Sequence, residues 1–127
     1  PLGGMHAAMK AAKNDSVFVF ASDMPCISGN LIKKHIDFYN KRSCDAAIPR
    51  IKDSKQPLHA IYNTRVLAQL NEFLEGANKY SIENFIKDLN VRYHNLEDLE
   101  EYKKAFVNIN TPQDLTTCIE HYELYHI

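Results

Sequence analysis

The sequence predicts an α/β domain in which helices are layered on a mostly parallel sheet. Helix-like and strand-like segments alternate along its 127 residues, which is typical of this class. The run at 17–21 is continuously apolar and β-prone, as in a strand that is covered on both faces. With 45% hydrophobic and 24% charged residues, the chain can bury a core, and we expect one domain over 1–127.

The individual elements follow from local patterns. Helix-forming residues and one-sided apolar spacing predict helices at 5–13, 29–42, 64–76 and 81–89, with a last helix that begins at 111. Thr64 and Ser81 are the expected N-caps of two of these helices. Short apolar runs predict further strands at 45–49, 57–62, 91–94 and 106–107.

Two polar segments fall where a parallel sheet binds ligands, beyond the carboxyl ends of its strands. The first, 22–25, directly follows the strand at 17–21 and contains Asp23. A carboxylate there can hold Mg²⁺ together with substrate phosphates, or it can merely close a turn before Pro25. The second segment, 108–112, directly precedes the last helix.

Small and amide residues supply further candidates. Gly3 and Gly4 allow close approach to their backbone, and the helix after them points free N–H groups toward an anion. The alternative is that this glycine pair is only a turn. Asn108 and Asn110 offer amide donors and acceptors that suit a polar ligand such as a phosphate. Their alternative role is local turn capping.

Charge and composition argue against several classes. The formal net charge of -1 predicts no polymeric nucleic acid as partner. No apolar run approaches the roughly 20 residues of a membrane-spanning helix, and no secretory signal opens the chain, so we expect a cytoplasmic protein with no membrane partner. The three cysteines, an odd number without a CxxC pattern, are expected to be reduced and mostly buried.

Four segments together resemble the molybdenum cofactor guanylyltransferases. They are PLGG at 1–4, ASDMP at 21–25, QPLHAIY at 56–62 and FVNINTPQDL at 106–115, in the family's order and spacing. The resemblance implies a three-layer α/β/α, Rossmann-like nucleotidyltransferase fold, and an enzyme that transfers GMP from GTP to molybdopterin and releases pyrophosphate. The chain departs from the family because it lacks the opening strand and glycine-rich loop, so it corresponds to the C-terminal two-thirds of the domain.

The resemblance also implies roles for individual residues. Asp23 is the expected catalytic and metal-binding residue, with Mg²⁺ as cofactor, and it binds the nucleotide together with Gly3 and Gly4. The residues expected to contact molybdopterin are Asn108, Asn110 and Lys79. His59 is expected to be a packed or hydrogen-bonded strand histidine rather than a catalyst. Other proteins of molybdenum cofactor biosynthesis and molybdoenzyme acceptors are expected partners.

Two alternatives remain open at this point. One is another nucleotidyltransferase of the same fold, either a molybdopterin cytidylyltransferase or a sugar-phosphate enzyme. This chain does not exclude it, because the choice of nucleotide base depends on the opening strand and glycine-rich loop that the chain lacks. The other is a non-catalytic remnant that binds pterin or oligomerises. We further expect the 127-residue chain alone to be inert, to bind GTP poorly and to self-associate, because strand edges and apolar helix faces would lack their cover.

Overall fold

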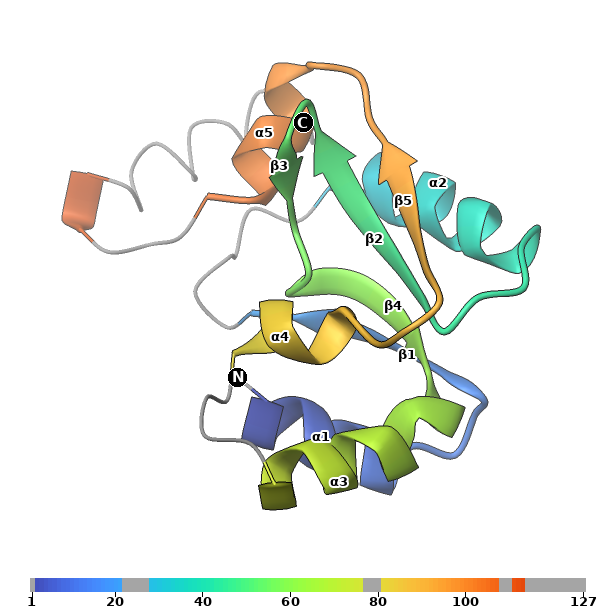
Figure 1. The fold of residues 1–127 in the computed structure, drawn as a ribbon. Helices are drawn as coiled ribbons and strands as arrows, with labels where there is room; N and C mark the ends of the chain where they lie inside the picture. Colours follow the sequence, from blue (N-terminus) through green and yellow to red (C-terminus); the bar gives the residue numbers. More distant parts are fainter. Residues whose placement is uncertain (1, 22–27, 77–80, 108–110, 114–127) are drawn as a thin grey trace.

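Helices and strands alternate in the computed structural model, which describes residues 2–21, 28–76, 81–107 and 111–113 (Figure 1). In chain order the elements are α1 (Leu2–Ala11), β1 (Ser16–Phe20), α2 (Gly29–Asn40), β2 (Ala46–Ile51), β3 (Ser54–Lys55), β4 (His59–Asn63), the 3-10 helix η1 (Thr64–Val66), α3 (Leu67–Gly76), α4 (Ile82–Ile86), β5 (Val91–Asn95) and α5 (Glu100–Ala105). This order confirms the predicted α/β class. No helix among the described residues is long and apolar enough to cross a membrane.

The five strands form one mixed sheet. β4 lies between β1 and β2 and is antiparallel to both, whereas β5 is parallel to β2 along its other edge. β3 forms a short antiparallel pair with the end of β2. It follows that β1, β2 and β5 run in one direction, as a parallel sheet requires, and that β3 and β4 run against them.

The antiparallel strand β4 departs from the expectation of a mostly parallel sheet, and connection length explains it. Helix α2 joins β1 to β2 and so lets these strands run in the same direction. Only 52–58 join β2 to β4, which is shorter than the crossover of about a dozen residues that a parallel neighbour needs. β4 therefore returns antiparallel to β2.

Helices cover both faces of the sheet and give three layers (Figure 1). α1, α3 and α4 cover one face, and α2 and α5 cover the other. The larger core lies under the first group, with buried residues that include Met5, Met9, Ile48, Tyr62, Leu70 and Phe85. A second core lies under α2 and α5, formed by Leu31, Ile51, Tyr102 and Ala105.

Most predicted helices form, with shifted ends. α1 begins at Leu2, three residues before the expected start. Ser81 caps α4 as predicted and accepts a hydrogen bond from the Asn84 N–H. At η1, however, Asn63 rather than Thr64 is the N-cap, because its side chain accepts from the Arg65 N–H. Cys44 is free and buried, as expected, whereas Cys26 and Cys118 lie outside the described residues.

The region before 108 differs most from expectation. The predicted strand at 106–107 does not form, because Phe106 ends the helix α5 as its C-cap. That helix was not predicted from the sequence. The last helix is described only over 111–113.

Candidate functional site

The carboxyl edge of the sheet is where β1, β2 and β5 all end. The pairing of β1 with β4 continues one residue past Phe20, since the Ala21 N–H donates to the Leu58 carbonyl at 2.9 Å. This bond fixes Ala21, the last described residue before the polar segment 22–25, at that edge. Asp23 itself lies outside the described residues, as do Lys79, Asn108 and Asn110.

The N-terminal end of α1 lies at the same side as the carboxyl end of β1, because helix and strand run in opposite directions (Figure 1). Gly3 and Gly4 belong to the first turn of this helix rather than to a turn before it. The N–H groups of a first turn have no intrahelical acceptor, and this first turn contains no acidic side chain. The helix end is therefore suited to an anion.

The surroundings of Gly4 show whether packing requires a glycine at this position. It is exposed, and a Cβ built on it would meet no atom within 4 Å. Packing within the described chain thus gives no reason for glycine at this position. Close approach of a ligand to the backbone would give one.

His59 lies at the centre of an aromatic cluster that joins two distant parts of the chain. Its ring centroid is 5.0 Å from that of Phe20 and 5.0 Å from that of Phe106, in edge-to-face arrangements. Phe20 ends β1 and Phe106 ends α5. The cluster therefore brings together the chain positions that lead into the two polar segments, 22–25 and 108–112.

The His59 ring is also an unsatisfied polar group. The residue is 1% exposed, and neither ring nitrogen has a hydrogen-bond partner in the described part of the chain. Burial lowers the pKa of this imidazole, so it is neutral at pH 7. The sequence-based expectation of a packed histidine is confirmed, but the alternative of a hydrogen-bonded one is not.

The segment QPLHAIY is held by bonds within itself and to β2. The Gln56 N–H donates to the Pro49 carbonyl at 2.9 Å, and the His59 N–H donates to the Gln56 carbonyl at 3.1 Å. The buried Tyr62 hydroxyl donates to the Pro57 carbonyl at 2.5 Å. These bonds fold the loop before β4 back onto the strand and position His59 beneath the carboxyl edge.

A second buried histidine, His35 of α2, was not singled out from the sequence. Its Nε2 lies 2.7 Å from the Ala47 carbonyl oxygen, and its Nδ1 lies 2.9 Å from Nδ1 of His94. Because a carbonyl only accepts, Nε2 donates to it, and the neutral ring then accepts from His94 through Nδ1. Burial is the main reason that the pKa of His35 is lowered to about 4. His94 and His59 lower the pKa by smaller amounts, and the hydrogen bond to the Ala47 carbonyl acts in the opposite direction.

The described residues contain no group of three or more His, Cys, Asp or Glu side chains that could hold a metal ion.

A family model described as the MobA-like NTP transferase domain matches residues 1–96. The chain belongs to this family. The molybdenum cofactor guanylyltransferase of Vibrio atlanticus is 34% identical to it over 116 residues, which cover 91% of this chain and 57% of that protein. The enzyme of the same name from Syntrophotalea carbinolica is 31% identical over 117 residues, covering 90% of this chain and 55% of that protein.

Solved structures agree with this assignment. The molybdopterin-guanine dinucleotide biosynthesis protein A from Archaeoglobus fulgidus superposes with a TM-score of 0.78 at 32% identity, covering 98% of this chain and 63% of that one. A protein from Aquifex aeolicus shares the fold, with a TM-score of 0.73 at 21% identity. The MobA-like nucleotidyltransferase fold is thus confirmed. This chain spans just over half the length of the relatives it matches.

Proposed function

We propose that this chain is part of a molybdenum cofactor guanylyltransferase, which transfers GMP from GTP to molybdopterin. The observation that carries the proposal is the similarity of nearly the whole chain to proteins of that name, at 31% and 34% identity. In support, the aromatic cluster around His59 joins the two chain positions that lead into the polar segments.

The nucleotide side of the proposed site combines α1 with the end of β1. The free N–H groups in the first turn of α1, at Gly3 and Gly4, would bind phosphate oxygens. Asp23 would hold Mg²⁺, and a single carboxylate fits this role because Mg²⁺ is commonly bound by one or two carboxylates plus substrate phosphates. When bound, the metal neutralises negative charge on the phosphates.

The molybdopterin side would use the segment after α5. Asn108 and Asn110 would bind the pterin or its phosphate through their amides, and Lys79 would pair with that phosphate. Transfer needs no protein nucleophile. A phosphate oxygen of molybdopterin forms a bond to the α-phosphorus of GTP while the bond to the β-phosphate oxygen breaks, and pyrophosphate leaves. The protein's contribution is to align the two substrates.

This reaction places the protein in the cytoplasm beside other molybdenum cofactor proteins and the molybdoenzymes that accept the product. The proposal is tested with the complete protein that contains this chain, by measuring dinucleotide formation from molybdopterin with GTP or CTP. We expect product from GTP only. A preference for CTP, or no transfer from either nucleotide, would overturn it.

The assignment of the two substrate halves has its own test. Asn110→Ala should weaken molybdopterin binding and leave GTP affinity nearly unchanged, as titrations of each substrate would show. Equal weakening of both substrates would instead assign Asn110 a structural role at the start of the last helix.

A further inference from the structure

In the part of the chain that the structure describes, the backbone groups along the outer edge of β5 are unpaired. Among the described strands, β5 pairs only with β2. The Asn90 carbonyl accepts from the Ala46 N–H, and the Leu96 N–H donates to the Arg50 carbonyl. Bonding to one neighbour alternates along a parallel strand, so even-numbered residues face β2. The residues that turn their N–H and C=O groups to the open edge are Val91, Tyr93 and Asn95.

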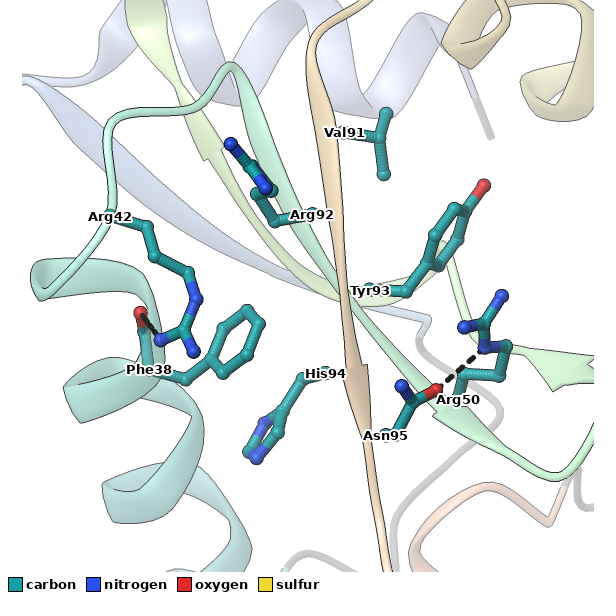
Figure 2. A pocket seen from close by; sticks show the side chains of 8 residues that line it. All are labelled: Phe38, Arg42, Arg50, Val91, Arg92, Tyr93, His94 and Asn95. Atoms are coloured by element: carbon teal, nitrogen blue, oxygen red, sulfur yellow. Dashed lines mark hydrogen bonds between the residues drawn. The ribbon is translucent and has the colours of Figure 1, made fainter.

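Positive charge borders this edge on both faces of the sheet (Figure 2). A shallow hollow of about 610 Å³ runs along β5, and its lining includes Arg42, Arg50 and Arg92 but no carboxylate. Arg92 shares the α2 face with Arg42, whereas Arg50 lies on the opposite face beside Asn95, its partner in register. The ion pairs of the described residues involve none of these three arginines.

Neutral groups hold two of the arginines in place. The guanidinium of Arg42 lies 3.6 Å from the ring centroid of Phe38, and its Nη1 donates to the Phe38 carbonyl at 2.9 Å. Phe38 in turn stacks on His94 at 4.3 Å. Arg50 donates from Nε to the Asn95 side chain at 2.8 Å. Both guanidinium groups are thus ordered without being neutralised, which lowers the entropy lost when an anion binds.

We propose that the open edge of β5 binds an extended acidic segment of a partner protein, which adds to the sheet as a strand. Main-chain bonds to Tyr93 and Asn95 would give affinity, and acidic side chains on the two faces of the added strand would meet Arg92 and Arg50. This inference goes beyond the proposed reaction, because β5 and β1 lie at opposite edges of the described sheet.

Other occupants fit less well. A second copy of this chain would bring its own arginines to the same edge, and like charges in opposition destabilise strand pairing. A nucleic acid cannot continue a ladder of alternating N–H and C=O groups, which is what Val91, Tyr93 and Asn95 offer. An acidic peptide strand satisfies both the backbone and the charges.

The test uses a fluorescein-labelled peptide of repeated Glu-Glu-Thr-Thr, which places glutamates on both faces of an added strand, with fluorescence anisotropy at low salt as the readout. We expect saturable binding that weakens with salt. A peptide with lysine in place of each glutamate is the charge control. A third peptide has the glutamate sequence with alternate backbone nitrogens methylated, which removes main-chain donors but keeps the charge. We expect it to bind about tenfold or more weakly, since main-chain bonds carry strand addition.

Charge-reversal variants locate the site. Arg92→Glu should weaken binding of the glutamate peptide by about tenfold or more. Lys33→Glu, an equal charge change at an exposed position of α2, should weaken it little. Circular dichroism checks that both variants are folded. Equal binding of the methylated and unmethylated glutamate peptides, or equal loss in the two variants, would overturn the proposal, and the methylation result does not depend on any variant.

Discussion

The two outer strands of the described sheet, β1 and β5, have opposite chemistry. β1 reads SVFVF and contains no charged residue. β5 reads VRYHN and is bordered by three arginines. Both strands pair on one side only among the described residues.

The open edge of β1 also carries backbone groups that no described residue pairs with. The Ala21 N–H donates to the Leu58 carbonyl, and the Thr64 N–H donates to the Asp15 carbonyl, so odd-numbered residues of β1 face β4. In an antiparallel pair the alternate residues point away. The residues of β1 whose backbone groups face the open side are therefore Ser16, Phe18 and Phe20.

The difference indicates two different uses of a strand edge. Proteins protect an exposed edge with charges, because an apolar edge pairs with any available strand. β5 has that protection, and its arginines would select an acidic partner. β1 has none, and its composition is that of an interior strand. We therefore infer that β1 is covered by another strand in the functional protein, whereas β5 stays accessible.

The largest expected effect is on catalytic activity, which should depend on the β1 side of the sheet and not on the β5 edge. If Asp23 holds the metal as proposed, Asp23→Asn in the complete protein should reduce turnover by about 100-fold or more, because the metal would lose its carboxylate ligand. Arg92→Glu at the β5 edge should leave kcat near that of the wild type. Steady-state guanylyl transfer measures both, with thermal unfolding as the control for fold. Magnesium-dependent transfer near the wild-type rate in the Asp23→Asn protein would refute the assignment.

Self-association compares the edges directly. We expect the 127-residue chain to self-associate through β1, and Phe20→Lys should shift it toward monomer because a charged side chain opposes strand pairing. Asn95→Lys on β5 is the matched control and should change little. Sedimentation velocity at several protein concentrations measures the proportions of monomer and oligomer. If Asn95→Lys dissociates the oligomers and Phe20→Lys does not, the chain associates through β5 and the prediction for β1 is wrong.

The buried histidines predict how stability depends on pH. The pKa of His35 is near 4 in the folded protein and near 6.5 when unfolded. As pH falls from 6.5 toward 4, the unfolded chain binds the proton first, so this group removes up to about 3 kcal/mol of stability. The lowered pKa values of His59 and His94 act in the same direction. Urea unfolding between pH 7.5 and 4.5 should show the decline.

His35→Gln provides the check on that prediction. The amide can still donate to the Ala47 carbonyl but cannot take up a proton in this range, so the dependence of stability on pH should become clearly flatter. An unchanged slope would assign the pH dependence to other groups.

The smallest effect concerns His59. His59→Leu removes a buried imidazole that has no hydrogen-bond partner among the described residues and should change the free energy of unfolding by no more than about 1 kcal/mol, in either direction. Ile61→Ala on the same strand, also buried, should cost about 2–5 kcal/mol through the cavity it leaves. Urea unfolding at pH 7.5 measures both. A loss above about 2 kcal/mol for His59→Leu would mean that the imidazole has a stabilising partner.

The sequence predicted those parts of the fold where local pattern and tertiary role agree. The apolar run at 17–21 gave β1, and the spacing around Leu31 gave α2. Helix α5 was missed for two reasons. Its N-cap is Leu99, whose side chain makes no capping hydrogen bond, and only two of its residues, Tyr102 and Ala105, are buried, so no apolar stripe marks it. Its acidic first turn and basic last turn were the available signal. The direction of β4 depends on tertiary pairing, which periodicity does not encode.

The site was predicted less evenly. Motifs identified Asp23, Lys79, Asn108 and Asn110, and these remain predictions because they lie outside the described residues. The role of His59 in bringing Phe20 and Phe106 together could not be read from the sequence, because these two residues are far apart along the chain. The bond between His35 and His94 likewise depends on the packing of α2 against β5 and β2.

Backbone amide hydrogen exchange in the complete protein tests the central claim most directly, namely that β1 is a covered strand and β5 an accessible one. The amides of Phe18 and Phe20 point to the open side of β1, and those of Tyr93 and Asn95 point to the open side of β5. We predict that the β1 amides exchange at least about 100-fold more slowly than the β5 amides, because only the former would be hydrogen-bonded to a further strand. Fast exchange at Phe18 and Phe20, with protection at Tyr93 and Asn95, would contradict the account.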